Sequence, residues 1–243
     1  MDLKNSTILI TGGTSGIGLE FVRQLTAHGA NIIVTGRNPE ALNDTKKMFP
    51  AVKTFQSDVS NPQDIEQLCE RVTAQFPELN IIINNAGIMR EINLLDSSKD
   101  LQNITREIDT NLSGTIQMVH QFLPHLQKQK SSAVVNVSSA IAFMGYAIAP
   151  IYSASKAGVH TYTKVLRAQL KKTNVKVFEV IPPGVTTPLQ KDFEHQPNPS
   201  QMMNVEKMVA VAIKGILNDK PEIKPGLSKV VKFMSRFMPD FVY

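Results

Sequence analysis

The chain has 243 residues, a length that suits one large α/β domain. With 42% hydrophobic and 19% charged residues, it is too apolar for a disordered protein. The net charge of +5 comes from basic residues that are spread out rather than clustered with aromatic ones, so no nucleic-acid partner is expected.

In chain order, short runs rich in Ile and Val alternate with longer segments of helical periodicity. The runs show no polar alternation, which is typical of parallel strands covered on both faces. This alternation predicts a single domain with a doubly wound parallel sheet and helices on both faces. Strands are predicted at Thr7–Thr11, Asn31–Thr35, Val52–Gln56, Ile81–Asn84, Ala133–Val137 and Val175–Ile181, and helices near Gly16–His28, Pro39–Phe49, Asn61–Phe76, Leu101–Lys130 and Ile151–Lys172.

A glycine-rich turn joins the first predicted strand to the first predicted helix. Glycines there let the backbone turn tightly and approach a pyrophosphate, which binds at the positive end of the helix. The spacing Gly-x-x-x-Gly-x-Gly is not a phosphate loop of the Gly-Lys-Ser/Thr type, so a dinucleotide is expected. The turn consists of Thr11, Gly12, Gly13, Thr14, Ser15, Gly16, Ile17 and Gly18.

The second predicted strand is followed by Gly36, Arg37 and Asn38 instead of the acidic residue that accepts the ribose hydroxyls of NAD. A guanidinium suits a 2′-phosphate, so the sequence favours NADP(H). The alternative is that Arg37 is simply solvated. Asp58, after the third strand, could accept a hydrogen bond from the adenine amino group or cap the turn that precedes Pro62.

Tyr152 and Lys156 are four residues apart in a predicted helix, and Ser139 precedes the tyrosine by thirteen positions. Residues i and i+4 share a helical face, so the Lys156 ammonium is expected beside the Tyr152 ring. A nearby cation favours the charged form of an acid and would lower the tyrosine pKa from about 10. The Ser139 hydroxyl could hold a substrate oxygen against the phenol. Taken alone, the pair is also compatible with an ordinary exposed contact.

These residues together resemble the short-chain dehydrogenase/reductase family in its ordinary single-domain form, over nearly the whole chain. Within that family the chain resembles bacterial oxidoreductases named for the D-alanine transfer operon. The resemblance implies a Rossmann fold with about seven strands. It is carried by the glycine turn, Asp58, Asn84-Asn85-Ala86-Gly87, Asn111, Ser139, Tyr152 and Lys156, all in the family's order and spacing.

The resemblance implies a catalytic tetrad of Asn111, Ser139, Tyr152 and Lys156. Tyr152 would be the general acid in reduction and the base in oxidation, with Ser139 rather than Ser138 as the active hydroxyl. Lys156 would lower the tyrosine pKa and hold the nicotinamide ribose hydroxyls. Asn111 would bind a water that links Lys156 to solvent.

The resemblance also implies cofactor contacts after the fourth and sixth strands. Asn84 to Gly87 would stabilise the centre of the sheet and contact the adenosine ribose, although a purely structural turn is the alternative. Thr187 would meet the carboxamide, in which case Pro183 replaces the family's usual glycine. The expected cofactor-binding residues are Gly12, Thr14, Ser15, Gly16, Ile17, Gly18, Arg37, Asn38, Asp58, Val59, Asn85, Ala86, Gly87, Tyr152, Lys156, Pro182, Val185 and Thr187.

Two further segments are expected near the substrate. The irregular, proline-rich stretch at about 187–203 is interpreted as a loop over the substrate, with a plain surface excursion as the alternative. Within the C-terminal segment 228–243, Ser228 to Phe237 predicts a basic amphipathic helix. This helix could touch an anionic membrane, but the cleft or a neighbouring subunit is favoured as its partner.

The single cysteine, Cys69, excludes an intrachain disulfide and favours a reducing, cytoplasmic location. No segment approaches the roughly 20 apolar residues of a membrane span, so no stable membrane insertion is expected. No metal site is predicted, because His120 and His125 are five apart and would not share a helical face.

The sequence therefore predicts an NADPH-dependent oxidoreductase that acts on a small carbonyl or alcohol substrate, as a homodimer or homotetramer by resemblance. The alternative is a non-catalytic NADP(H)-binding sensor or scaffold protein. A sugar epimerase or dehydratase of the family's extended branch would need an additional substrate domain, for which the chain has no room.

Overall fold

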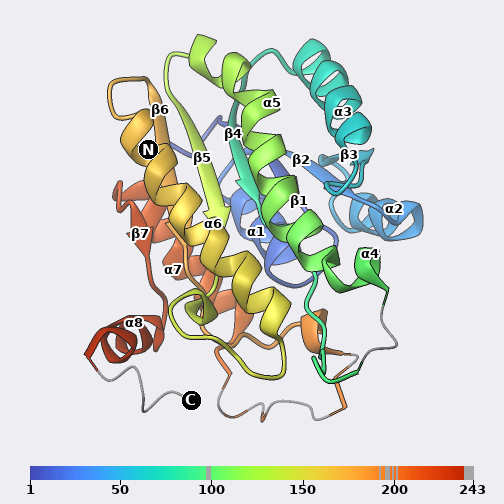
Figure 1. Ribbon diagram of the computed structural model, residues 1–243. Coiled ribbons are helices and arrows are strands. Elements are labelled where there is room, and N and C mark those ends of the chain that lie inside the picture. Colours follow the sequence, from blue (N-terminus) through green and yellow to red (C-terminus); the bar gives the residue numbers. More distant parts are fainter. Residues whose placement is uncertain (97–99, 192, 195–197, 199, 201, 238–243) are drawn as a thin grey trace.

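Seven parallel strands form one sheet in the order β3-β2-β1-β4-β5-β6-β7. The computed structural model describes residues 1–243 except 97–99, 192, 195–197, 199, 201 and 238–243 (Figure 1). The chain starts at the centre of the sheet, runs to one edge, and then crosses back to build the other half. The strands are β1 (Thr7–Thr11), β2 (Asn31–Gly36), β3 (Lys53–Gln56), β4 (Leu79–Asn84), β5 (Ser132–Val137), β6 (Val175–Val180) and β7 (Glu222–Ile223).

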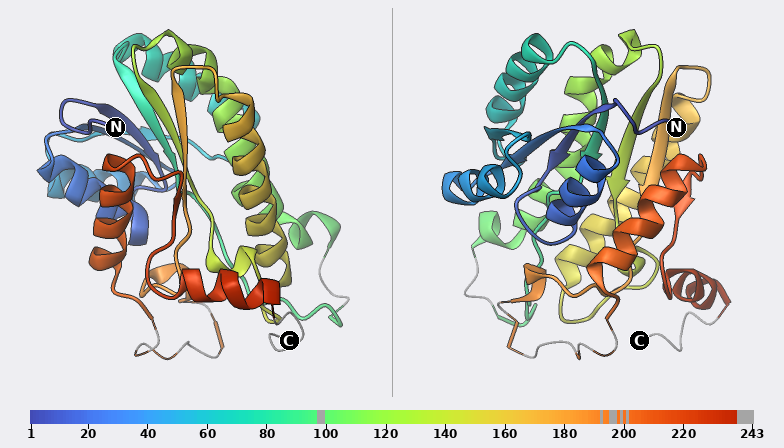
Figure 2. Two further views of the ribbon diagram at one scale, coloured as in Figure 1. Left: turned by 90° about the vertical axis from the view of Figure 1, so that its left-hand side faces the viewer. Right: turned by 180° about the vertical axis from the view of Figure 1, so that it is seen from behind.

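Helices cover both faces of this sheet, as the two further views show (Figure 2). The core on one face includes side chains of α1, α2 and α7, and the core on the other includes side chains of α3, α5 and α6. The predicted single α/β domain with a doubly wound sheet is therefore confirmed. The helices are α1 (Gly16–Ala27), α2 (Pro39–Met48), α3 (Pro62–Gln75), α4 (Leu101–Ile104), α5 (Gly114–Lys128), α6 (Pro150–Gln169), α7 (Val205–Leu217) and α8 (Ser228–Phe237).

The two strands on either side of β4, β1 and β5, are buried along their whole length. Every residue of β1 and of β5 is buried, which explains why neither strand shows polar alternation. A sheet covered by helices on both sides has no solvated face, so apolar residues can occupy successive positions.

The segment near Leu101–Lys130 is helical over most of its length, as predicted, but it is not one regular α-helix. It is divided into α4, a π-helical turn over Ile108–Ser113, and α5. Close packing fixes the start of α5: a Cβ added to Gly114 would lie 2.4 Å from the carbonyl oxygen of Val59. The start of α5 is thus pressed against the loop after β3, and the wide turn before it carries Asn111.

Two elements escaped prediction from the sequence. The seventh strand has only two residues, Glu222–Ile223, too few for any periodicity. Helix α7 packs its buried residues in the same core as α1. The predicted helix at Ser228–Phe237 is confirmed as α8. Its side chains Val230, Phe233 and Phe237 are exposed, whereas Ser228 is buried, so much of its apolar surface faces outward.

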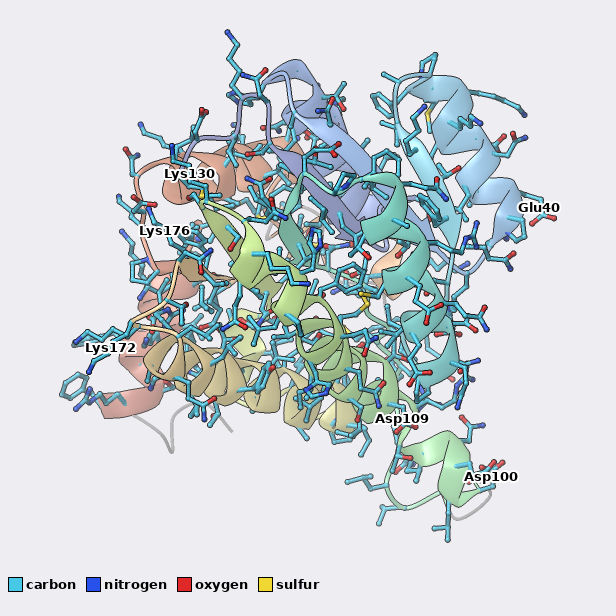
Figure 3. The ribbon with its side chains drawn as sticks, turned by 90° about the horizontal axis from the view of Figure 1, so that it is seen from above. Glu40, Asp100, Asp109, Lys130, Lys172 and Lys176 are labelled. Carbon is cyan, nitrogen blue, oxygen red and sulfur yellow. The ribbon has the colours of Figure 1, made fainter. Side chains whose placement is uncertain are left out.

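Part of the positive charge lies at loops between the C-terminal ends of helices and the following strands. Lys130, Lys172 and Lys176 lie on one side of the view from above, and Asp109 and Asp100 on the other (Figure 3). Lys176 pairs with Asp219 at 2.7 Å. Lys130 and Lys172 belong to the α5–β5 and α6–β6 connections and Lys176 to the start of β6, at the end of the sheet opposite the loops that follow the strands. Their charge is therefore not directed at those loops.

Candidate active site

A cleft of about 700 Å³ is formed by the loops that follow the carboxyl ends of the strands. Its size is within the range of small-molecule and cofactor sites, and its position is where ligands bind in open α/β sheets. All predicted cofactor-binding residues except Gly18 line it: Gly12, Thr14, Ser15, Gly16, Ile17, Arg37, Asn38, Asp58, Val59, Asn85, Ala86, Gly87, Tyr152, Lys156, Pro182, Val185 and Thr187.

The glycine turn is held tightly against the segment that follows β4. Gly12 and Gly16 have φ angles of +64° and +51°, which side chains rarely adopt. A Cβ on Gly18 would lie 2.2 Å from the carbonyl oxygen of Gly12. The absence of a side chain at Gly18 therefore lets the start of α1 pack closely against the turn. Ser15, the N-cap of α1, makes no side-chain capping bond, and the first turn of α1 has no acidic residue. Backbone N–H groups at this helix end suit the pyrophosphate of a dinucleotide, so the turn fits such a cofactor.

Arg37 and Asp58 lie side by side at the edge of the cleft. Arg37 is half exposed, and its Nη1 is 3.7 Å from Asp58 Oδ2. Asp58 Oδ1 accepts hydrogen bonds from the backbone N–H of Ser60 at 2.9 Å and from its hydroxyl at 2.7 Å. Asp58 therefore caps the turn before α3. Asn38 caps α2 by accepting from the backbone N–H of Ala41 at 2.9 Å.

The segment Asn84–Gly87 binds the centre of the sheet together. Asn85 Nδ2 donates to the carbonyl oxygens of Thr11 and Gly12, at 3.1 and 3.2 Å. The Thr11 hydroxyl accepts from the backbone N–H of Asn85 and of Ala86, both at 3.0 Å. Asn84 donates to Asn136 on β5 at 2.8 Å. Asn84 and Asn85 therefore stabilise the centre of the sheet through hydrogen bonds. Ala86 and Gly87 line the cleft.

Ser139, Tyr152 and Lys156 meet at one wall of the cleft. Ser139 follows β5, while Tyr152 and Lys156 lie in the first turns of α6. All three are buried, with exposures of 7%, 5% and 4%. Lys156 Nζ donates to the carbonyl oxygen of Val137 at 3.0 Å and lies 5.7 Å from the centre of the Tyr152 ring.

Burial has opposite effects on the two ionisable groups. It raises the pKa of Tyr152 to about 12, and a hydrogen bond with Ser139 acts in the other direction. It lowers the pKa of Lys156 to about 8. The expected acidification of Tyr152 by Lys156 is therefore not found in the protein alone, because removing the phenolate from water outweighs the other effects. At neutral pH Tyr152 is a phenol, the form that can donate a proton.

Asn111 lies behind the cleft rather than in its wall. It is 1% exposed, within the π-helical turn before α5. Its Oδ1 accepts from the backbone N–H of Ile88 at 2.9 Å, and its Nδ2 donates to the Ile88 carbonyl and the Ser155 hydroxyl, each at 3.0 Å. Asn111 thus fixes the segment after β4 against the helix that carries Tyr152.

The loop after β6 closes the cleft beside the glycine turn. A Cβ on Gly16 would lie 3.3 Å from the Cβ of Thr187, whereas Thr186 does not line the cleft. Val185 pairs with Met203 at the far end of the expected substrate loop. Residues 192, 195–197, 199 and 201 of that loop, and residues 238–243 of the expected C-terminal segment, lie outside the described residues.

Sequence reasoning missed an ion pair at the entrance. Arg90 lines the cleft and pairs with Glu107, which is completely buried just before the π-helical turn. The backbone N–H of Arg90 also donates to Glu107 Oε1 at 3.1 Å. Arg90 lies only three residues after Gly87, the end of the Asn-Asn-Ala-Gly segment. This short spacing was the one sequence signal that could have placed Arg90 near the cleft.

Comparison with known proteins identifies the family. The model for short chain dehydrogenases matches residues 6–198. The chain belongs to the short chain dehydrogenase family. It is 37% identical to the uncharacterized oxidoreductase DltE of Bacillus subtilis (strain 168), over 92% of this chain and 89% of that protein. It is 32% identical to an uncharacterized oxidoreductase of Staphylococcus aureus (strain MW2), over 84% of this chain and 87% of that one.

Solved structures of this family have the same fold. A short chain dehydrogenase/reductase from Burkholderia phymatum, in complex with NAD, matches with a TM-score of 0.87 at 20% identity, over 98% of this chain and 96% of that chain. A short chain dehydrogenase from Burkholderia cenocepacia J2315, in complex with NADP, matches with a TM-score of 0.85 at 23% identity, over 99% and 97%. The chain is thus a short chain dehydrogenase in both sequence and fold.

Proposed function

We propose that this short chain dehydrogenase is an NADPH-dependent carbonyl reductase that also works in reverse as an alcohol dehydrogenase. One observation carries the proposal: a buried serine hydroxyl, a phenol and an ammonium group converge on the cleft that contains the glycine turn. A substrate carbonyl between Ser139 and Tyr152 would lie next to a proton donor with a pKa of about 12.

Each residue then has a defined role. The bound nicotinamide supplies the hydride. Tyr152 donates its proton to the carbonyl oxygen in reduction and removes it from the alcohol in oxidation. Ser139 orients that oxygen, and Lys156 holds the nicotinamide ribose hydroxyls and favours negative charge on the Tyr152 oxygen. Asn111 would position a water that connects Lys156 to solvent. The loop at 187–203 would cover the substrate.

Arg37 supports a preference for NADP(H). It lines the cleft after β2, where the NAD-specific pattern has an acidic residue. Asp58 would receive the adenine amino group at the same edge. Structures of the same fold contain either NAD or NADP, so the fold itself favours neither cofactor.

The proposal is tested by measuring NADPH consumption against a panel of aldehydes, ketones and quinones, with NADH in parallel. Turnover of at least one carbonyl class, abolished in a Tyr152→Phe variant, would support the enzyme. Tight NADPH binding with no turnover across the panel would favour the alternative, a sensor or scaffold protein that keeps the fold.

A pH dependence follows from the low pKa of Lys156. The charged ammonium is present below about pH 8 and is lost as the pH rises through that value, whereas Tyr152 keeps its proton until about pH 12. We expect kcat/KM for NADPH in carbonyl reduction to fall by about tenfold per pH unit above 8, because kcat/KM reports the free enzyme. A rate that stays constant to pH 9.5 would contradict a requirement for a Lys156 ammonium with a pKa of about 8.

We also propose a cytoplasmic homodimer or homotetramer. Among the described residues, no helix is long and apolar enough to cross a bilayer. Ile116 on α5 and Val165 on α6 are exposed apolar side chains on the helices expected at the subunit contact. Light scattering gives the molar mass directly, and a monomer at micromolar concentration would contradict the assembly.

A further inference from the structure

A buried carboxylate lies directly behind the serine-bearing wall of the cleft. Glu179, on β6, is completely buried and does not line the cleft. The Ser138 hydroxyl donates to Glu179 Oε1 at 2.6 Å. His160 Nδ1 lies 2.9 and 3.0 Å from the two carboxylate oxygens and must be the donor, because an ionised carboxylate only accepts. Glu179 has no part in the proposed proton transfer.

The two partners of Glu179 belong to the two elements that carry the reactive groups. Ser138 immediately precedes Ser139 at the end of β5. His160 is four residues after Lys156 on α6, so these two side chains extend from the same helical face. One carboxylate therefore connects the serine-bearing strand end with the helix that bears Tyr152 and Lys156.

Burying a carboxylate is costly unless it is paired and hydrogen-bonded. An ordinary core position on a covered strand would hold an apolar residue, as Val177 and Val180 on the same strand show. The three short contacts to Glu179 compensate for its burial and make its position depend on Ser138 and His160. A displacement of either partner leaves a buried charge incompletely bonded, so the arrangement resists changes in their separation.

We infer that Glu179 is a positioning residue, which through Ser138 and His160 sets the separation between the Ser139 hydroxyl and the Tyr152 phenol. This inference rests on the proposed function for its catalytic consequence. A misplacement of reacting groups by about 1 Å can cost roughly 100-fold in rate.

A second hydrogen bond, from Lys156, also connects α6 with the end of β5. Lys156 donates to the carbonyl oxygen of Val137, the residue before Ser138. In the proposed function the Lys156 ammonium, which has three N–H donors, must also hold the ribose hydroxyls, so this link is shared with cofactor binding. Ser138 lines the cleft, but its hydroxyl donates to Glu179, so the link through Glu179 uses no side-chain group assigned to cofactor or substrate.

The surroundings of the pair contain further charged groups. Glu222 on β7 is the neighbour of Glu179 across the β6–β7 pairing, and it accepts from Lys224 at 2.8 Å and from Lys232 of α8 at 2.7 Å. Lys232 lies 5.1 Å from the centre of the Phe143 ring, and that ring meets His160 edge-on at 4.9 Å. The second carboxylate is thus paired with its own lysines, and the hydrogen bonds to Glu179 come from Ser138 and His160.

The test compares Ser138→Ala and Glu179→Gln with wild type in both reaction directions. Each variant should lower kcat by about 10- to 100-fold and leave KM for NADPH within about twofold, because the cofactor contacts are unchanged. Glu20→Gln is the matched control: Glu20 is a buried acid on α1 that bonds Arg23 and Gln24. It should keep the wild-type kcat.

The pH profile separates positioning from general destabilisation. The bond to Ser139 lowers the pKa of Tyr152, so weakening that bond raises the pKa further. In both variants the Tyr152 phenolate, measured as the ultraviolet difference from Tyr152→Phe, should form at higher pH than in the wild type. A merely structural loss would lower the rate without moving that titration.

Crystal structures of Ser138→Ala and Glu179→Gln test the positioning role of Glu179 without relying on enzyme activity. A larger Ser139 Oγ to Tyr152 Oη distance than in wild type is expected in both. If the wild type is active and Tyr152→Phe is not, but both variants keep the wild-type kcat, profile and distance, positioning by Glu179 is overturned while the proposed function stands. If the wild type reduces no carbonyl, the distances alone decide: a change supports positioning, and no change overturns it.

Discussion

Replacing Tyr152 by phenylalanine is expected to lower kcat for carbonyl reduction by about 10²- to 10⁴-fold, the range typical of a positioned proton donor. The substitution removes only the hydroxyl from a side chain that is 5% exposed, so packing is preserved. The Kd for NADPH should stay within about twofold, because the glycine turn and Arg37 lie elsewhere in the cleft. Stopped-flow turnover and fluorescence titration of NADPH give the two quantities.

Tyr162→Phe is the matched control for this experiment. Tyr162 is on the same helix, and burial likewise raises the pKa of its hydroxyl to about 12. It does not line the cleft, so its loss should leave kcat unchanged. Wild-type turnover in Tyr152→Phe would remove Tyr152 from the mechanism.

The second large effect is expected for cofactor choice. Arg37→Ala should weaken NADPH binding by roughly 10- to 100-fold, the contribution of a charge-assisted bond to a phosphate. NADH lacks the 2′-phosphate and should lose less than about threefold. The Arg37 guanidinium is half exposed beside Asp58, so its removal disturbs no core packing. Isothermal titration with both cofactors measures the difference.

Arg236→Ala supplies the control for loss of a surface cation. Arg236 is exposed on α8 and does not line the cleft, so both cofactors should bind as they do to the wild type. Equal weakening of NADPH and NADH by Arg37→Ala would mean that Arg37 does not read the phosphate.

Much of the fold was predictable because the apolar runs and helical periodicities that indicate strands and helices involve only residues close together in the sequence. Five of the predicted strands lie within a residue of β1, β2, β3, β5 and β6 at each end, since buried parallel strands read as continuous apolar runs. The signal failed where the run was too short, as in β7, and it did not reveal the π-helical turn over Ile108–Ser113 within a continuous helical periodicity.

The candidate site was predictable to a similar degree. Residues that follow successive parallel strands meet at one end of the sheet, so Gly12, Arg37, Asp58 and Ser139 share the cleft as their positions suggested. The ionisation of Tyr152 was not predictable, because spacing gives the distance to a cation but not the degree of burial. Burial raises the pKa to about 12, opposite to the expected direction.

By itself, the sequence determined the family, the parallel sheet and the residues that face the cleft, because these follow from periodicity and from motifs a few residues long. Only the tertiary structure decided that Asn111 lies behind the wall and that Glu179 joins Ser138 to His160. Those contacts connect residues that are far apart in the chain. Their chemistry depends on exclusion from water, which is a property of the packed protein rather than of any segment.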